Sequence, residues 1–124
     1  MSLLRTNKLD GVKDDLKRVA YRAAELCPFD IVVLEGVRTY ERQVQLVERG
    51  ASRTLRSKHL TGGAIDLAPM LDTDNDGDTE ISWHWPHYHE LAQYVKTAAE
   101  ELGIEIEWGG DWKTFKDGPH WQLP

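Results

Sequence analysis

The first third of the chain carries a helical hydrophobic pattern followed by a strand-like one. From residue 10 to residue 27, apolar side chains recur at the spacing of an amphipathic helix. We expect Asp10 to be its N-cap and Pro28 to end it. The segment DIVVLEGVR at residues 30–38 is rich in β-branched residues, which predicts a strand buried on both faces. Arg38 would then lie at the C-terminal end of this strand.

The middle of the chain predicts a second helix, a polar loop and a short strand. Thr39 can cap a helix over residues 40–50, which ends at a glycine. Its inward-facing side chains are expected to be Val44, Leu46 and Val47. Residues 51–63 form a polar loop of the length that functional loops have. Residues 64–69, AIDLAP, alternate as a strand in which Asp66 shares one face with two alanines.

The remaining residues predict a long helix and two strands. An acidic loop over residues 71–85 leads to Pro86, where a helical apolar pattern begins and continues to Leu102. The segment IEIEW at residues 104–108 alternates as a strand, and a hairpin-like turn connects it to a last strand at residues 119–124. This order of elements predicts one α+β domain over the whole chain, with a small, mainly antiparallel sheet backed by helices.

Composition narrows the function classes. The chain has 124 residues, enough for one hydrophobic core, and a formal net charge of −6 without a dense basic run. Phosphate binding requires a basic face, so we expect no nucleic-acid partner. A local basic patch is still compatible with this charge, for example at Arg53, Arg56 and Lys58. The single cysteine, Cys27, excludes an internal disulfide and is expected to be a buried structural thiol.

The N-terminal residues lack the apolar core of a signal peptide. No window approaches the ~20 apolar residues of a membrane span either. We therefore expect a chain made in the cytoplasm without a membrane anchor, which would reach any target outside the membrane by another exit route.

Asp66 is the first residue that points to chemistry. An aspartate in the middle of a strand must be exposed, paired or bound to a cation, because burying a free carboxylate is costly. His59 precedes it on a loop in which Gly62 and Gly63 leave room for the two side chains to approach. Taken alone, this pair fits a solvated histidine and a salt-bridged aspartate as well as it fits a metal site.

The C-terminal segment DGPH at residues 117–120 adds a second histidine and a second carboxylate. Catalytic zinc usually has three protein ligands and an open position for water, whose pKa falls to about 7. His59, Asp66 and His120 would supply two nitrogens and one oxygen, and Asp117 would be free to accept a proton from the water. Such a ligand set also accepts other divalent ions.

Three segments, in this order, resemble the zinc D-Ala-D-Ala and L-alanyl-D-glutamate peptidase family. GVRTYERQ at residues 36–43 is similar to its Val-Arg-(Ser/Thr)…Arg-Gln segment, and SKHLTGGAID at residues 57–66 matches its Ser-x-His-x-x-Gly-x-Ala-x-Asp signature. EWGGDWKTFKDGPHWQ at residues 107–122 is similar to the C-terminal motif of its endopeptidase, or endolysin, branch. The resemblance covers about residues 30–124 and implies a Hedgehog/DD-peptidase-like fold.

The resemblance also implies roles for the matching residues. His59, Asp66 and His120 would hold one zinc ion, and Asp117 would be the catalytic acid/base. Arg38 would contact the substrate near the scissile carbonyl and stabilise the developing oxyanion. The alternative for Arg38 is a surface arginine that pairs with a neighbouring glutamate. The carboxypeptidase branch often has a Glu and a His-x-His or Trp-His pair at the C-terminal motif, so the DGPH sequence favours the phage L-alanyl-D-glutamate endopeptidase branch.

Three further residues are candidates for substrate contacts, and each also has a structural alternative. Ser57 is a candidate, although a serine there can equally cap the loop. Gln43 is a second candidate, with a supporting or helix-surface role as the alternative. Of Trp108, Trp112 and Trp121, we expect one to line the site, and we select Trp108 as the substrate contact, although large aromatics are more often part of a core.

Acidic side chains in the loop before the long helix predict a calcium site. The residues concerned are Asp72, Asp74, Asp76, Asp78 and Glu80. They occupy positions 1, 3, 5, 7 and 9 of a calcium loop with Gly77 at position 6, but Trp83 stands at position 12, where an EF-hand has a bidentate glutamate. A structural or regulatory Ca²⁺ ion is one interpretation, and a solvated acidic loop is the other.

The leading hypothesis is a zinc-dependent peptidoglycan endopeptidase of the endolysin type, which hydrolyses the L-Ala–D-Glu bond of the stem peptide. A D-Ala-D-Ala dipeptidase or carboxypeptidase is the nearest alternative. A zinc-stabilised, non-catalytic wall-binding or signalling domain is an alternative from another class. We expect a monomer that acts on peptidoglycan stem peptides after release from the host cytoplasm through a holin-type pore.

Overall fold

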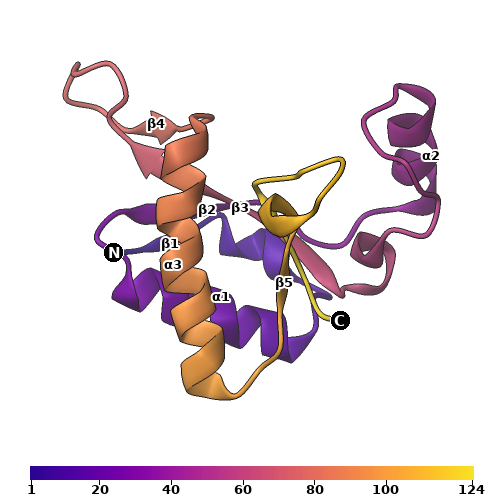
Figure 1. Cartoon of the computed structure of the whole chain (residues 1–124), viewed down its shortest axis with the longest axis horizontal. Helices are drawn as coiled ribbons and strands as arrows, with labels where there is room; N and C mark the ends of the chain where they lie inside the picture. The colour runs from indigo at the N-terminus through magenta and orange to yellow at the C-terminus, as the bar shows by residue number, and fades with distance from the viewer.

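The computed structural model describes residues 1–124 and contains a six-stranded mixed sheet and three α-helices (Figure 1). The strands are Leu3–Leu4 (β1), Asp30–Glu35 (β2), Ala64–Leu71 (β3), Glu80–Ile81 (β4), Glu107–Trp108 (β5) and His120–Gln122 (β6). The strand order is β1-β2-β3-β6-β5, and β4 pairs with β3 beside this path. Strands β1 and β2 are parallel, and every other pair is antiparallel. The prediction of an α+β fold with a mainly antiparallel sheet is therefore confirmed.

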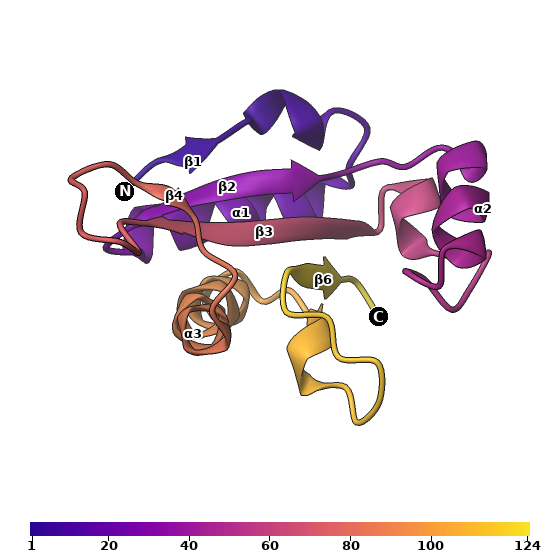
Figure 2. The ribbon, with the colours of Figure 1, turned by 90° about the horizontal axis from the view of Figure 1, so that it is seen from above.

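Two long helices pack together beside the sheet, and one short helix lies at its end. The helices are Asp14–Leu26 (α1), Tyr40–Glu48 (α2) and Trp85–Leu102 (α3), with 3-10 helices at Thr6–Leu9 (η1), Lys58–Thr61 (η2) and Gly109–Asp111 (η3). Helices α1 and α3 pack against each other beside the sheet. Helix α2 lies apart from them, at the end of the sheet toward which β2 points (Figure 2). None of the helices is long and apolar enough to cross a membrane.

The hydrophobic core joins the long helices to the central strands. Leu16 of α1, Leu91 and Val95 of α3, and Ile65 and Leu67 of β3 are each at most 1% exposed. Burying an aliphatic side chain of this size stabilises a fold by about 1.5–3 kcal/mol. Strand β3 is therefore fixed along its length, and the polar residue between its two core side chains is held on a rigid support.

Helix α1 ends where the sequence predicts but begins later. Cys27 is its C-cap, is 2% exposed as expected of a structural thiol, and precedes Pro28. Asp10 is not its N-cap, because Asp10 ends η1 and Gly11 then turns the chain at a φ of +79°. The apolar pattern continues through this turn because Val12 is buried in the core without being helical. The helical spacing of apolar residues in the sequence therefore extends beyond the helix itself.

Helix α2 begins at its predicted residue but ends two residues early, at Glu48, and it does not have its predicted buried face. The Thr39 side chain caps it by accepting a hydrogen bond from the Arg42 amide. The expected inward residues Val44, Leu46 and Val47 are only partly buried. The buried residue is Gln43, which is 0% exposed. The reason is that α2 lies at the end of the sheet, where the groups nearest to Gln43 are polar and form hydrogen bonds with its side-chain amide.

The short strands differ most from the prediction. Neither β1 nor β4 was expected, since two residues are too few to show a period of two. Strand β2 ends at Glu35, so Arg38 follows it in a loop. Burial alternates over residues 104–108 as expected, but only the last two residues pair with a neighbouring strand. Strand pairing depends on partners that are distant in sequence, which the local pattern does not contain.

Candidate metal centre and active site

A row of polar side chains crosses three neighbouring strands at one end of the sheet. Glu35 of β2 pairs with Asp66 of β3, and Asp66 pairs with His120 of β6. Directly opposite residues of antiparallel strands project on the same face. The register of β2 shifts between Val33 and Glu35, which makes Leu34 an extra residue of a β-bulge. Without this bulge, Leu34 would stand opposite Asp66, so the bulge brings a glutamate into the row.

His59 reaches Asp66 from η2. The Ser57 side chain accepts a hydrogen bond from the His59 amide and caps this 3-10 helix. Two contacts then fix it to the loop after β2: the Arg38 amide donates to the His59 carbonyl at 3.0 Å, and His59 Nδ1 lies 2.8 Å from the Gly36 carbonyl oxygen. Since a carbonyl only accepts, Nδ1 carries the proton and the Nε2 lone pair is free. The imidazole is therefore oriented by the backbone of the loop after β2.

The glycines after His59 serve a different purpose from the one expected. Gly62 has a φ of +77° as the C-cap of η2, and a Cβ there would lie 2.4 Å from the Gly11 carbonyl oxygen. The Lys13 amide also donates to the Gly62 carbonyl at 2.9 Å. Gly62 thus allows η2 to pack against the turn before α1 rather than making room between His59 and Asp66.

His120 is oriented by a chain of side-chain hydrogen bonds. Its Nε2 lies 2.8 Å from Gln122 Oε1, and the Gln122 amide donates to Glu107 at 2.8 Å. Because Glu107 accepts from the amide nitrogen, the amide oxygen faces the imidazole, and Nε2 of His120 carries the proton. The Nδ1 lone pair then points toward Asp66. Outer partners of this kind fix the tautomer and direction of metal-binding histidines.

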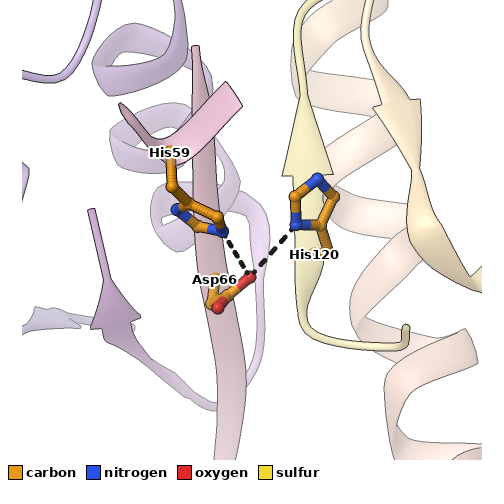
Figure 3. Close-up of side chains that lie close together, drawn as sticks. All are labelled: His59, Asp66 and His120. Carbon is orange, nitrogen blue, oxygen red and sulfur yellow. Dashed lines mark ion pairs between the residues drawn. The ribbon is translucent and has the colours of Figure 1, made fainter. Parts of the chain in front are cut away.

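The three side chains converge on one point (Figure 3). His59 Nε2 and His120 Nδ1 lie 3.3 and 3.5 Å from the same oxygen, Oδ1 of Asp66. His59 Nε2 and Asp66 Oδ1 are buried without a hydrogen-bond partner. With neutral imidazoles, two nitrogen lone pairs and a carboxylate oxygen face each other in a buried place, an arrangement that only a cation stabilises. The donor set therefore fits a divalent metal ion such as zinc.

The pKa values of Asp66 and His120 also indicate that a positive charge is favoured in the cluster. Burial by itself raises the pKa of Asp66, but the facing His120 and His59 outweigh burial and hold the pKa of this carboxyl well below its usual range. For His120, burial lowers the pKa, and the Asp66 carboxylate outweighs it and raises the pKa above the ordinary histidine value. In the protein without metal, a proton on His120 therefore takes the place of the ion.

Asp117 lies beside this cluster and has the opposite electrostatic character. Burial raises its pKa, and the negative charge of Asp66 raises it further. The Asp117 amide donates to the Gly109 carbonyl at 3.0 Å, and a Cβ at Gly109 would lie 2.4 Å from the Asp117 carbonyl oxygen, so this close contact requires glycine. The sequence GGD after β5 thus holds the loop that presents Asp117. A carboxyl group with a raised pKa is suited to accept and return a proton.

Arg38 is held by two side chains. Its Nε and one terminal nitrogen donate to the two Glu35 oxygens at 2.7 and 2.8 Å, and its other terminal nitrogen donates to Gln43 at 2.6 Å. The guanidinium also lies 3.9 Å from Asp66, at the cluster. Arg38 therefore pairs with a glutamate, as the alternative expected, and it also faces the cluster with N–H groups that remain uncommitted.

The cluster opens into a cleft of about 610 Å³. Arg38, Ser57, Trp112 and Asp117 line it together with the three converging residues. The ring of Trp112 lies 5.1 Å from that of His120 between centroids. The expected substrate contact Trp108 is instead 3% exposed, donates to the Gly118 carbonyl and stacks on Trp121 in the core. The choice of Trp108 was therefore wrong, and Trp112 is the tryptophan at the cleft.

Gln43 supports the cleft from inside and has no surface for a substrate. Besides accepting from Arg38, it donates to Ser52 Oγ at 2.9 Å and to the Thr54 carbonyl at 2.5 Å. Its assignment as a substrate contact is therefore corrected to the supporting role that was the alternative. Glu35 and Gln122 were missed altogether, although Gln122 follows His120 by two positions on a strand, which is the spacing of side chains on one face.

The acidic loop forms a second group of potential ligands. Carboxylate oxygens of Asp72, Asp74, Asp76 and Glu80 lie within 4.8 Å of one another, and Asp78 is not part of this group. The residues are exposed or partly exposed, and the Gly77 amide donates to Asp72 at 2.9 Å. The expected calcium residues thus gather except for Asp78, but they already bind amides of their own loop.

The fold and the site together define a class of protein. A small α+β domain that presents a buried His/Asp/His set beside a carboxyl group with a raised pKa has the arrangement of a single-metal hydrolase. The sequence matches the family described as Phage L-alanyl-D-glutamate peptidase over residues 1–121. The chain belongs to this family, so the resemblance found in the three motifs is confirmed and extends to the N-terminal residues.

Individual relatives agree with the family. The chain is 36% identical over 114 residues to the L-alanyl-D-glutamate peptidase of Escherichia phage T5, covering 89% of this chain and 79% of that protein. It is 34% identical over 122 residues to the L-alanyl-D-glutamate peptidase of Listeria phage A118, covering 98% of this chain but only 40% of the relative. The crystal structure of the Serratia marcescens L-Ala D-Glu endopeptidase ChiX is similar with a TM-score of 0.88 and 43% identity, covering all of this chain and 90% of ChiX.

Proposed function

We propose that this protein is a zinc-dependent peptidoglycan endopeptidase that hydrolyses the L-Ala–D-Glu bond of the stem peptide. The observation that carries the proposal is the convergence of His59 Nε2, His120 Nδ1 and Asp66 Oδ1 in a buried place, where His59 Nε2 and Asp66 Oδ1 have no hydrogen-bond partner. The family and the activities of the relatives support this choice of substrate. The cleft is large enough for a peptide segment around the cluster.

The metal ligands would be His59, Asp66 and His120. A zinc ion bound there would polarise the scissile carbonyl and lower the pKa of a water molecule, which is the chemistry that the protein's own side chains lack. Three protein ligands are the number that catalytic zinc usually has, whereas structural zinc usually has four. The hydrogen bonds of His59 to Gly36 and of His120 to Gln122 would hold both imidazoles in the correct tautomer before the metal binds.

Asp117 is the proposed acid/base. Its carboxylate would take a proton from the attacking water and pass this proton to the nitrogen of the leaving D-Glu. Its raised pKa favours both steps, because a stronger base accepts the proton and the resulting acid is still able to return it. The backbone contact with Gly109 keeps the carboxyl group on the rim of the cluster.

Arg38 is the proposed stabiliser of negative charge on the carbonyl oxygen. Glu35 and Gln43 fix its guanidinium, so little reorganisation is needed when charge develops. Ser57, which lines the cleft, is the remaining candidate for a substrate contact. The protein would act as a monomer on the cell wall after release through a holin-type pore.

A test separates the catalytic proposal from mere metal binding. In Asp117→Asn, we expect zinc content and the thermal transition to persist while hydrolysis of purified muropeptides falls by about 10²–10⁴-fold. Asp111→Asn is the matched control, because Asp111 lies in the same connection but is exposed and pairs with Lys96. Mass spectrometry of the products identifies the bond that is cut.

Three results would contradict the proposal. A wild-type protein that binds zinc and never cleaves is a non-catalytic domain. Release of D-Ala or D-Ala-D-Ala identifies a carboxypeptidase or dipeptidase. Equal activity of the wild type and Asp117→Asn removes Asp117 from the mechanism.

A further inference from the structure

The cleft mouth is basic although the chain as a whole is acidic. The formal net charge is −6, yet two loops beside the cleft, at residues 51–58 and 112–116, contain basic side chains and no acidic ones. The basic residues are Arg53, Arg56, Lys58, Lys113 and Lys116. Arg53, Arg56 and Lys58 line the cleft, and none of the five takes part in an ion pair. This concentration of unpaired positive charge favours an anionic ligand.

The acidic residues inside the cleft do not neutralise these cations. Glu35 holds the Arg38 guanidinium through both oxygens, and Asp66 faces the two histidines. The remaining acid, Asp117, has a role in the proposed proton transfer. The loop cations therefore have no carboxylate of this chain to bind.

Of the three loop cations that line the cleft, Arg56 has the fewest contacts. The Arg53 guanidinium lies 5.3 Å from the centroid of the Phe115 ring and donates to Thr114 at 3.4 Å, so it closes the cleft between the two loops. Lys58 donates to the Leu123 carbonyl. The Arg56 side chain makes no hydrogen bond within the chain, so its whole guanidinium fork is available to a ligand.

The backbone that carries Arg56 is nevertheless anchored. Its amide donates to Thr54 Oγ1 at 2.9 Å, and the buried Gln43 amide binds the Thr54 carbonyl and Ser52. On its other side, Ser57 caps η2, which contains His59. The backbone of Arg56 is thus tied on one side to Gln43, which supports Arg38, and on the other to η2, which carries His59, so its side chain extends from an anchored segment at the same cleft.

The substrate has an anionic group close to the scissile bond. In a stem peptide, D-Glu continues through its side-chain carboxyl, so its α-carboxylate is free and is attached to the carbon next to the scissile nitrogen. This inference rests on the proposed function: we propose that Arg56 binds this α-carboxylate. Arg53, which contacts the loop at residues 112–116, supports the same anion. Arg56 is thereby a specificity-determining residue that selects stem peptides with a free carboxylate over peptides in which this group is amidated.

Three synthetic stem peptides test the proposal on the zinc-loaded, full-length protein. One has both carboxylates free, the second has an amide at the D-Glu α-carboxyl, and the third has an amide at the carboxylate of the following diamino acid. For the wild type we expect kcat/KM to fall by about 10–100-fold for the second peptide and to stay unchanged for the third. Arg56→Gln is expected to lose the same factor on the first and third peptides and nothing on the second. Arg18→Gln, an exposed cation on α1, is the control and should behave as the wild type.

The outcomes separate the carboxylate site from the activity itself. Equal losses on all peptides in Arg56→Gln indicate a structural effect and overturn the proposal, as does no loss on any. A loss that follows the third peptide moves the recognised anion to the diamino acid and overturns the D-Glu assignment. If the wild type cleaves no peptide, the proposed function fails. Calorimetric binding of the D-Glu-containing product peptide then still decides the site, because equal affinity of the wild type and Arg56→Gln overturns it.

Discussion

The protein has two groups of potential metal ligands, and they differ in almost every physical respect. The group at the end of the sheet combines two imidazoles with one carboxylate, and its ligand side chains are at most 16% exposed. The group in the loop between β3 and β4 consists of carboxylates alone and lies in solvent. In both groups the ligand atoms lie within 4.8 Å of one another, so distance alone does not distinguish them.

The difference lies in what each group would do without an ion. In the loop, water and amides such as that of Gly77 satisfy the carboxylates, and the Gly77 hydrogen bond lowers the pKa of Asp72. In the buried group, His59 Nε2 and Asp66 Oδ1 have no partner, and neighbouring groups force both lone pairs toward the same point. A buried, unpartnered and oriented donor set indicates a binding site more strongly than a cluster of exposed charges does.

The largest expected effect comes from replacing one carboxylate by an amide in each of the two groups and comparing the results. Asp66→Asn replaces a ligand oxygen by an amide that cannot match its charge, and we expect zinc affinity to fall on the order of 10³-fold and hydrolysis to be lost with it. Asp74→Asn makes the same change in the loop and should leave zinc affinity and activity unchanged. Competition with a chromophoric chelator measures the affinity, and circular dichroism checks the fold. Equal zinc affinity in both variants would contradict the assignment of the buried group.

A second, smaller effect is the pH dependence of stability. In the metal-free protein the pKa of His120 is raised above its unfolded value of about 6.5, so its contribution to stability is complete below that pH and is lost as the pH rises through the folded pKa. The free energy of unfolding should therefore decrease between about pH 6 and 8. With zinc the sign should reverse, because deprotonated ligands bind the metal better.

Urea unfolding at these pH values, with a chelator and with zinc, measures both slopes. His120→Ala is the control and should abolish the metal-free decrease. A metal-free protein whose urea midpoint stays constant over this range, with His120 intact, would show that no proton replaces the ion in the cluster.

The smallest expected effect belongs to the acidic loop. Its incomplete ligand set, without the glutamate at position 12, predicts weak calcium binding with a dissociation constant of about 10⁻⁴–10⁻³ M. At millimolar calcium and fixed zinc, the thermal midpoint should rise by about 2–5 °C in the wild type and not in Asp74→Asn. Identical melting curves with and without calcium would leave the loop as a solvated acidic turn.

The local pattern predicted the elements that have enough residues to show a period. Helix α3 begins beside Pro86 and ends at Gly103, and β3 contains Asp66 between two core residues, as the sequence indicates. It did not predict β1 and β4, because two-residue strands exist only through their partners. It also did not predict the burial of Gln43, since a glutamine on an exposed-looking helix becomes buried only when Arg38 and the Thr54 carbonyl surround it.

The candidate site was predicted in its ligands more fully than in its surroundings. The motif residues His59, Asp66 and His120 meet, because a motif preserves residue types that act together. The choice among the tryptophans was wrong, since Trp108 and Trp112 have equal chemistry and only the fold buries Trp108 of β5 in the core while Trp112, after η3, lines the cleft. Glu35 was missed because only the bulge at Leu34 aligns it with Asp66.

The sequence by itself determined the fold class, the family and the residue types of the metal cluster, because these follow from periodicity and from the spacing of chemically specific side chains. Only the tertiary structure decided which nitrogen of each imidazole faces Asp66, which residues support Arg38 and which cations remain unpaired at the cleft. Such properties arise from contacts between segments that are far apart along the chain, for example between η2 and Gly36 after β2, and between Gln122 of β6 and Glu107 of β5. The burial that makes the cluster need a cation therefore appears only after the chain has folded.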